Sequence, residues 1–371
     1  AHAAEESIKE AMLITQNENA GRGLARIYRL FSLVQLTNNL FSEAIDYFSF
    51  AVENAHKSND TAELGISSYY AAVAHFIFGN ISKALSLAEE ARTASLDAVL
   101  PGWADRSRFL KGRLYFETGL YEKALDIFEE LKSGPYGSIT EDFTNTVNAW
   151  IYRSGVFIDH KARTETVKLA GFDAKLFRAE AAFIEGKYKK VLELINKVDN
   201  SEMDEDMILI EQSDWRSGFY QCELLLFPLH NLKNRMINTL RVLSHCYLNK
   251  EEDRTEVTGG EPADFQSGIA KAHPTGYTGG SEEAIREMQW IMRDDLPEKD
   301  PNGSFYLYSY YQLLKQTGAQ EVDMNTAISI AFKRLQKRAS RIEDADIKRS
   351  FLSTHYWNSA LTAAAKEHKL M

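Results

Sequence analysis

One segment of the sequence carries enough closely spaced oxygen ligands to suggest metal chemistry. Residues 294–303, which run Asp-Asp-Leu-Pro-Glu-Lys-Asp-Pro-Asn-Gly, hold four carboxylates. Oxygen-rich loops can bind calcium, but calcium loops place carboxylates at alternate positions around a glycine. That alternation is missing here, and Lys299 lies inside the segment. We therefore expect a solvated turn between helices and no metal site.

The sequence contains no other arrangement that indicates catalysis. It has no P-loop, no GxSxG nucleophile elbow and no HExxH zinc motif. Its nine histidines are scattered, and we expect His355, beside Tyr356 and Trp357, to be an ordinary packed side chain. We expect no enzymatic activity, no cofactor and no catalytic residue.

Composition limits the class of partner. The 43 basic and 53 acidic residues give a net charge of −10, whereas nucleic-acid binding rewards a basic surface. No apolar run approaches the roughly 20 residues that cross a bilayer. Cys222 and Cys246 lack the spacing of a metal-binding pair and do not fix the compartment. We expect a cytoplasmic protein with a protein partner, and a periplasmic location is the alternative.

An internal repeat is the strongest signal in the chain. Residues 40–48, 80–88 and 120–128 align without gaps, and their shared alanines are Ala44, Ala84 and Ala124. The step is therefore 84 − 44 = 40 and 124 − 84 = 40 residues. A fourth copy has Val191 in the alanine position, 191 − 124 = 67 residues further on, so an insertion precedes it.

Each copy predicts a pair of antiparallel helices. A small residue recurs where the first helix would cross its partner, namely Ser32, Ala72, Gly112 and Ala179. The first helix would end near Asn39, Gly79, Gly119 and Gly186. Glycine and asparagine accept the left-handed conformation that stops a helix. Small residues facing large ones let paired helices approach closely.

These features resemble the tetratricopeptide repeat (TPR) family. The third copy carries the family's consensus residues, which are Gly112, Tyr115, Gly119, Tyr121, Ala124, Phe128 and Pro135. The resemblance covers about residues 25–200, although the family's own step is shorter, roughly 34 residues. It implies an all-α fold, an α-α superhelix of antiparallel helix pairs with irregular helical insertions. A helical bundle with coincidental spacing is the alternative.

We expect the first 200 residues to hold the repeats, in the order of a leading helix at 3–14, pairs at about 25–58, 65–98, 105–138 and 172–205, and an insertion at 139–171. Residues 201–250 would form a degenerate helical pair, and residues 251–303 a loop and a short helix. The loop at 251–281 is rich in Gly, Thr, Pro and Glu. Residues 304–371 would form a C-terminal helical repeat with capping helices. The leading helix has no first helix before it, which suggests either an array that continues upstream or a helix that is itself the cap.

The C-terminal part resembles the TPR tail of bacterial multidomain signalling regulators, in which such arrays follow cyclase or ATPase domains. An Arg-Ile-x-Asp element at 341–344 and an Arg-x-Phe-Leu element at 349–352 carry the resemblance. The family's Asn-Arg pair is here Asn358-Ser359. The resemblance implies that this chain is the sensory or scaffolding region of a larger protein.

The TPR resemblance also implies a binding groove on the inner face of the first helices. By register, the candidate groove residues are Arg26, Arg29, Leu33, Tyr69, Val73, Phe76, Arg106, Phe109, Arg113 and Phe116. Arginines pair with carboxylates, and aromatic side chains give apolar contact. The predicted partner is an acidic, partly apolar peptide or a partner helix. The alternative is that Val73, Phe76 and Phe116 are core residues and that the arginines are solvated.

Two functions remain open at this point. The first is a protein-protein interaction scaffold or sensor region within a bacterial signalling protein. The second is a free-standing exported TPR protein, periplasmic or lipid-anchored, that serves an envelope assembly or a transporter. An upstream catalytic domain would support the first function, and a signal peptide would support the second.

Overall fold

The computed structural model describes residues 6–7, 10–11, 13–14, 21–37, 40–133, 141–158, 171–197, 236–248, 284–286, 288–289 and 302–370. Within these ranges the secondary structure is helical and contains no strand. Three predictions lie largely outside them: the first half of the pair at 201–250, the loop at 251–281 and the carboxylate segment at 294–303. Only short parts of the leading helix are described, and these are helical.

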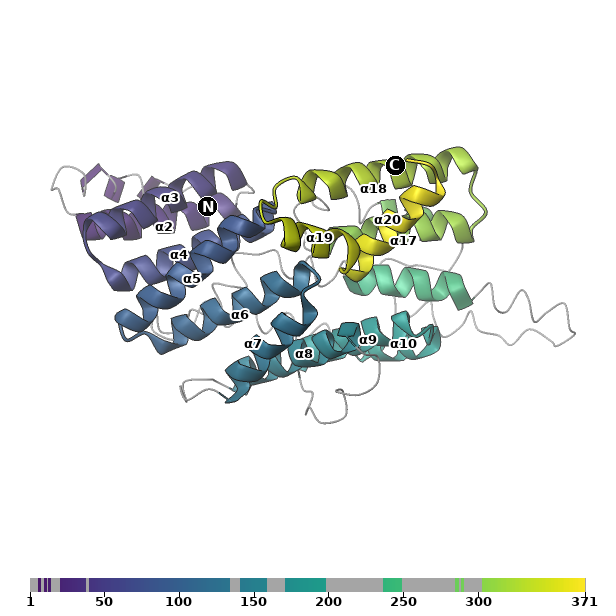
Figure 1. The fold of residues 1–371 in the computed structure, drawn as a ribbon, viewed down its shortest axis with the longest axis horizontal. Helices are drawn as coiled ribbons and strands as arrows, with labels where there is room; N and C mark the ends of the chain where they lie inside the picture. The colour runs from purple at the N-terminus through teal and green to yellow at the C-terminus, as the bar shows by residue number, and fades with distance from the viewer. Residues whose placement is uncertain are drawn as a thin grey trace, which may run out of the picture.

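The N-terminal part is a row of helices, each packed on the next (Figure 1). The helices are α2 (Gly21–Thr37), α3 (Phe41–Lys57), α4 (Thr61–Phe78), α5 (Ile81–Asp97), α6 (Pro101–Glu117), α7 (Tyr121–Ser133), α8 (Glu141–Ile158), α9 (Gly171–Ile184) and α10 (Tyr188–Asn196). The first helices α2, α4 and α6 also contact one another, as in a solenoid of helix pairs. The predicted fold class, an all-α TPR-like solenoid, is confirmed.

The 40-residue step continues further than the repeat motif suggested. Helices α2, α4, α6 and α8 begin at residues 21, 61, 101 and 141, so each start lies 40 residues after the previous one. The segment predicted as an insertion at 139–171 therefore contains α8, which packs between α7 and α9. The predicted stop glycines end their helices as expected, since Gly79, Gly119 and Gly186 have φ values of +85°, +77° and +73°.

The chain ends in a second group of helices, α17 (Gly303–Gln316), α18 (Glu321–Ala339), α19 (Ala345–Ser353) and α20 (Tyr356–Glu367). Helices α17, α18 and α20 pack on one another, and α19 packs on α18 and α20. In Figure 1 this group, green to yellow, lies beside the middle of the row, and hydrogen bonds between side chains and backbone atoms join the two parts. We call α17–α20 the C-terminal helix group.

The interior of each helix pair shows the predicted packing of small against large residues. Ala44, Ala84 and Ala124 are fully buried in the second helices. Gly112 lies where α6 crosses α7, and a Cβ atom added there would be 2.6 Å from a ring carbon of Phe128. That separation is shorter than a van der Waals contact, so the glycine sets the distance between α6 and α7.

This packing predicts different effects for two glycines of the same helix. Gly112→Val should lower the free energy of unfolding by about 1–3 kcal/mol, because the added carbons overlap the Phe128 ring. Gly102→Val is the matched control, because nothing lies within 4 Å of its added Cβ, and its effect should stay within about 0.5 kcal/mol. Urea unfolding followed by circular dichroism measures both, and equal losses would contradict the crossing.

Candidate partner-binding groove

The predicted groove residues lie on one face of α2, α4 and α6, which are neighbours in the row (Figure 1). Spacings of three and four residues place them in line along each helix. We call this face the groove face. The residues of the groove face differ in how much of each side chain remains exposed.

In α2, the two candidate arginines have different surroundings. Arg29 is buried and donates from Nε to Oε1 of Glu63 at 2.5 Å and from Nη2 to Oε2 at 3.2 Å. Ser67 donates a further hydrogen bond to Glu63 Oε1 at 2.8 Å. Arg29 therefore links α2 to α4 within the fold. Arg26, one turn earlier, is exposed, and Leu33 is half-buried.

In α4, the groove face is covered by other parts of the same chain. Tyr69, Val73 and Phe76 are no more than 3% exposed. They belong to one apolar cluster that also contains Leu307 and Tyr311 of α17. The Tyr69 ring contacts that of Trp103 in α6, and the Arg113 guanidinium lies over the Phe76 ring.

In α6, the aromatic groove residues pack on the next helices of the row. The Phe109 ring contacts those of Phe128 in α7 and Trp150 in α8. The Phe116 ring contacts those of Trp150 and Phe157 in α8. Both residues belong to a second cluster that also contains Phe305 of α17 and Trp357 of α20. The burial of Val73, Phe76 and Phe116 matches the alternative in which these residues form core. The aromatic part of the predicted groove is therefore occupied within the chain.

The remaining arginines of α6 stack on aromatic rings. The guanidinium carbon of Arg113 lies 5.5 Å from the ring centre of Phe76 and 4.9 Å from that of Trp150. The guanidinium carbon of Arg106 lies 4.8 Å from the ring centre of Trp103, and the side chain is partly exposed. Arg26, Ile66 and Arg106 occupy equivalent positions, 40 residues apart, near the starts of their helices. They form the accessible end of the groove face.

Arg341 attaches the C-terminal helix group to the end of α4. Its guanidinium donates from Nη1 to the backbone carbonyl of Phe78, the last residue of α4, and lies 4.5 Å from the Phe78 ring centre. The backbone amide of Glu343 donates to Ser82 Oγ at 3.2 Å. The carbonyls at a helix C-terminus carry partial negative charge, so a cation there is stabilising.

A second attachment lies at the turn between α6 and α7. A Cβ atom on Gly119 would be 2.5 Å from the backbone nitrogen of His355 and 2.9 Å from its Cα. The amide of Tyr356 donates to the Tyr121 hydroxyl at 2.9 Å. Gly119 is thus required both by its positive φ and by the close approach of another backbone.

An ion pair lies buried between α8 and α9. Arg153 Nε and Nη2 donate to the two carboxylate oxygens of Glu180 at 2.8 and 3.0 Å, and Nη2 reaches Asn302 Oδ1 at 3.4 Å. Their side chains are only 5% and 1% exposed. Burial acts to lower the pKa of Arg153, but the Glu180 carboxylate outweighs it, and the pKa is raised. This two-point pairing satisfies the buried Arg153 guanidinium inside the fold.

Two further titratable groups, Glu117 of α6 and His355 before α20, lie near this pair where the C-terminal helix group meets the row of helices. Glu117 Oε2 lies 4.0 Å from His355 Nε2, and both side chains are buried. Burial raises the pKa of Glu117, opposed by the Arg153, Arg113 and Arg338 charges. Burial, together with Arg338 and Arg153, lowers the pKa of His355 to about 3. The imidazole is therefore neutral, and its Nδ1 accepts from the Asn358 amide at 3.3 Å, capping α20.

These buried charges serve the fold. Each is matched by an opposite charge or a helix cap within the chain. The described residues hold no group of His, Cys, Asp or Glu suited to a metal ion, and none of their helices is long and apolar enough to cross a membrane. Arg153 is not among the groove residues predicted from the sequence. It lies 153 − 113 = 40 residues after Arg113, so extending the repeat step by one copy would have placed it on the groove face.

Comparisons with known proteins agree with the helical repeat. A family model described as a C-terminal domain, TP_0123_C, matches residues 273–369, which include α17–α20. A TPR repeat-containing protein of Treponema pallidum (strain Nichols) is 21% identical over 398 residues, covering 99% of this chain. The chain spans only 42% of the length of that relative. The similarity supports a TPR assignment and, in general, a protein-interaction scaffold. The resemblance to signalling-regulator tails stays a prediction.

The turn at Gly119 predicts a loss of stability specific to the C-terminal helix group. Gly119→Ala should cost about 2–4 kcal/mol, because it combines left-handed strain with a clash against the His355 backbone. Gly186→Ala carries similar strain, with φ of +73° and nothing within 4 Å, and should cost about 1–2 kcal/mol. Chemical unfolding compares them, and equal costs would contradict the proposed seating of His355.

The buried His355 predicts a dependence of stability on pH. Its pKa in the folded chain, about 3, lies below the unfolded value of 6.5. Between these values only the unfolded chain binds the proton, so stability falls as the pH drops from about 6.5 towards 3. The loss from pH 7 to pH 5 should be roughly 2 kcal/mol.

His355→Asn tests this dependence, because asparagine keeps a helix cap and does not titrate. The variant should lose less stability than the original chain between pH 7 and pH 5. His75, whose pKa is lowered to about 4 by burial and Lys83, contributes equally in both proteins. If the melting temperatures of the two proteins fell by the same amount between pH 7 and pH 5, His355 would not be the source of the pH dependence.

Proposed function

We propose that this chain is a protein-interaction scaffold that binds an acidic, partly apolar peptide at the accessible end of its groove face. The exposure of Arg26 and the partial exposure of Arg106, on either side of Ile66, carry the proposal. The chain is acidic overall, so two accessible cations aligned on one face form a distinct local feature.

The contacts of the arginines favour the accessible end of the groove face as the binding site over the buried end. Arg29 is already paired with Glu63, and Arg113 lies between the rings of Phe76 and Trp150. A partner would have to break contacts of the fold to reach either guanidinium. A partner can reach Arg26 without breaking contacts of the fold, because its side chain is exposed to solvent.

The chemistry of the accessible end favours a particular partner. A guanidinium presents parallel N–H donors that match a carboxylate, so Arg26 and Arg106 would select Asp or Glu side chains. Ile66 lies between them in the row and is partly exposed, which suits an apolar residue of the peptide. An extended peptide crossing α2, α4 and α6 would then alternate acidic and apolar contacts.

The larger setting is part of the proposal. We place the scaffold within a longer bacterial signalling protein. The competing proposal is a free-standing scaffold that is exported to the cell envelope. The relative is itself much longer than the matched region. Sequencing the full gene product distinguishes the two settings, because a neighbouring cyclase or ATPase domain supports the first and an export signal supports the second.

Charge reversal tests the binding surface. The double variant Arg26→Glu/Arg106→Glu should weaken binding of a fluorescent peptide that alternates glutamate and leucine by about tenfold or more, because two charge-assisted contacts become repulsive. Fluorescence anisotropy at low salt measures this affinity. A peptide with lysine in place of glutamate should not bind.

The matched control is Arg349→Glu, since Arg349 is 75% exposed but lies on α19, away from the groove face. It makes the same charge change per site and should leave peptide affinity within about twofold. Circular dichroism checks that all variants keep their helices. Equal weakening by the control, or no binding of the acidic peptide by the original chain, would refute the proposal.

A further inference from the structure

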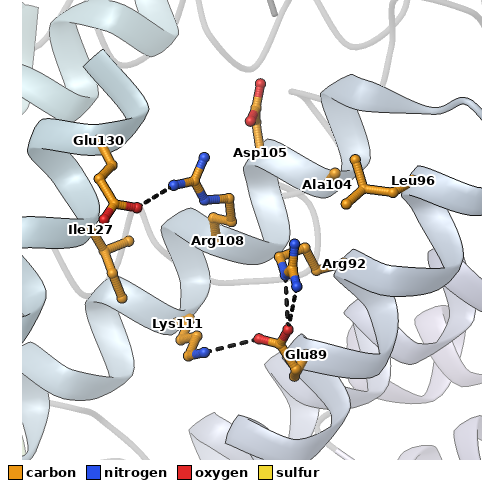
Figure 2. A pocket seen from close by; sticks show the side chains of 9 residues that line it. All are labelled: Glu89, Arg92, Leu96, Ala104, Asp105, Arg108, Lys111, Ile127 and Glu130. Carbon is orange, nitrogen blue, oxygen red and sulfur yellow. Dashed lines mark hydrogen bonds and ion pairs between the residues drawn. The ribbon is translucent and has the colours of Figure 1, made fainter. Parts of the chain in front are cut away.

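Helix α6 carries cations on two of its sides, and those on one side already join it to its neighbours. A pocket lies between α5, α6 and α7, and Arg108 and Lys111 line it (Figure 2). Helical spacing places both residues on the side of α6 opposite Arg106. Arg108 contacts Glu130 of α7 at 2.5 Å, and Lys111 contacts Glu89 of α5 at 2.9 Å. The pocket side of α6 is therefore a seam of the row, held by ion pairs.

Arg106, on the groove face of α6, has a different kind of contact. Its guanidinium carbon lies 4.8 Å from the ring centre of Trp103, which is one turn earlier in the helix. A cation over the face of an indole ring is attracted by the negative charge of the π system. A stacked guanidinium can still donate hydrogen bonds, because its N–H groups lie in its own plane. The Arg106 side chain is partly exposed, so a partner can reach it from solvent.

The Trp103 ring is held in place by the core of the row. Trp103 is buried, and its ring meets those of Tyr69 and Tyr70 in α4 edge to face, with 5.5 and 5.7 Å between ring centres. Aromatic pairs favour this arrangement. Because the indole is fixed from α4, a guanidinium stacked on it loses part of the rotational freedom that a solvated arginine keeps. Arg106 is therefore oriented before any partner arrives.

The repeat register separates Arg106 from the other accessible arginine of the groove face. Arg26 and Arg106 occupy equivalent positions of their repeats. The residue three before Arg106 is Trp103, whereas the residue three before Arg26 is Gly23, which has no side chain. The ring on which Arg106 stacks is therefore missing from the equivalent position in α2. The two arginines carry the same charge but differ in how far the fold orients them.

We propose that Trp103 is a positioning residue that makes Arg106 the specificity-determining contact of the groove face. This inference rests on the function proposed above, in which the partner is an acidic, partly apolar peptide. A guanidinium that is oriented before binding offers two parallel N–H donors to a carboxylate at a smaller cost in rotational entropy. Arg106 therefore acts through the geometry of its guanidinium, which selects an Asp or Glu side chain of the peptide, whereas Arg26 acts mainly through its charge.

Substitutions that keep the positive charge test this difference, with fluorescence anisotropy of the glutamate–leucine peptide as the measurement. Arg106→Lys should weaken binding by about fivefold or more, because the paired donors and the stacking on Trp103 are lost. Arg26→Lys should weaken binding by only about twofold, because the charge remains. Arg108→Lys makes the same change on the pocket side of α6 and is the control, so it should leave the affinity unchanged.

Trp103→Leu separates positioning from a purely structural role. It removes the ring, so adding Arg106→Lys in this background should weaken binding by only about twofold. If Trp103 were only structural, Arg106→Lys would have the same effect with and without the ring. Circular dichroism checks that each variant keeps its helices. If Trp103→Leu failed to fold, the comparison of Arg106→Lys with Arg26→Lys would decide, because both variants keep Trp103.

The outcomes distinguish this inference from the function on which it rests. Equal weakening by Arg106→Lys and Arg26→Lys would overturn the inference and leave the proposed peptide binding intact. The same effect of Arg106→Lys in the presence and absence of the Trp103 ring would also overturn it. Failure of the original chain to bind the peptide would refute the proposed function and the inference together.

Discussion

The arrangement of the molecule depends on the close approach of two backbones, at Gly119 and His355. No side chain fits between them, so the α19–α20 connection lies directly on the α6–α7 turn. That seating brings Trp357 into the aromatic cluster of α6 and places His355 against Glu117. The absence of one Cβ atom thus allows the close contact between the C-terminal helix group and the third helix pair.

Burial divides the groove face into two regions. The aromatic residues of α4 and α6 are buried among neighbouring helices, in clusters that extend to α17 and α20, and they stabilise the fold. Towards the starts of the first helices, Arg26, Ile66 and Arg106 keep contact with solvent. The same helical face thus acts as core at one end and, in our proposal, as recognition surface at the other. The arginines follow this division, since Arg29 and Arg153 have carboxylate partners inside the fold.

Features encoded by local spacing could be predicted from the sequence. The helix pairs, the stop glycines and the small residues at crossings depend on neighbours within one or two helices, and a 40-residue step made them visible. Contacts between segments that lie far apart in the chain leave no periodic pattern in the sequence. Arg341 and Phe78 are 263 residues apart, and nothing periodic connects them. An apolar face on α4 was equally compatible with a peptide groove and with cover by the chain's own end.

The position of the covering helices at the end of the chain has a consequence for biosynthesis. A simple solenoid can fold as it emerges, because each pair needs only its neighbour. Here the C-terminal ends of α4 and α6 await Arg341 and His355, which lie 341 − 78 = 263 and 355 − 119 = 236 residues after the positions they contact, so translation between them takes roughly 12–53 seconds. Throughout that time the end of α4 and the α6–α7 turn lack the contacts that the C-terminal helix group supplies. A product cut short before α17 would lack them permanently, and quality-control proteases could distinguish it from the finished chain by this one surface.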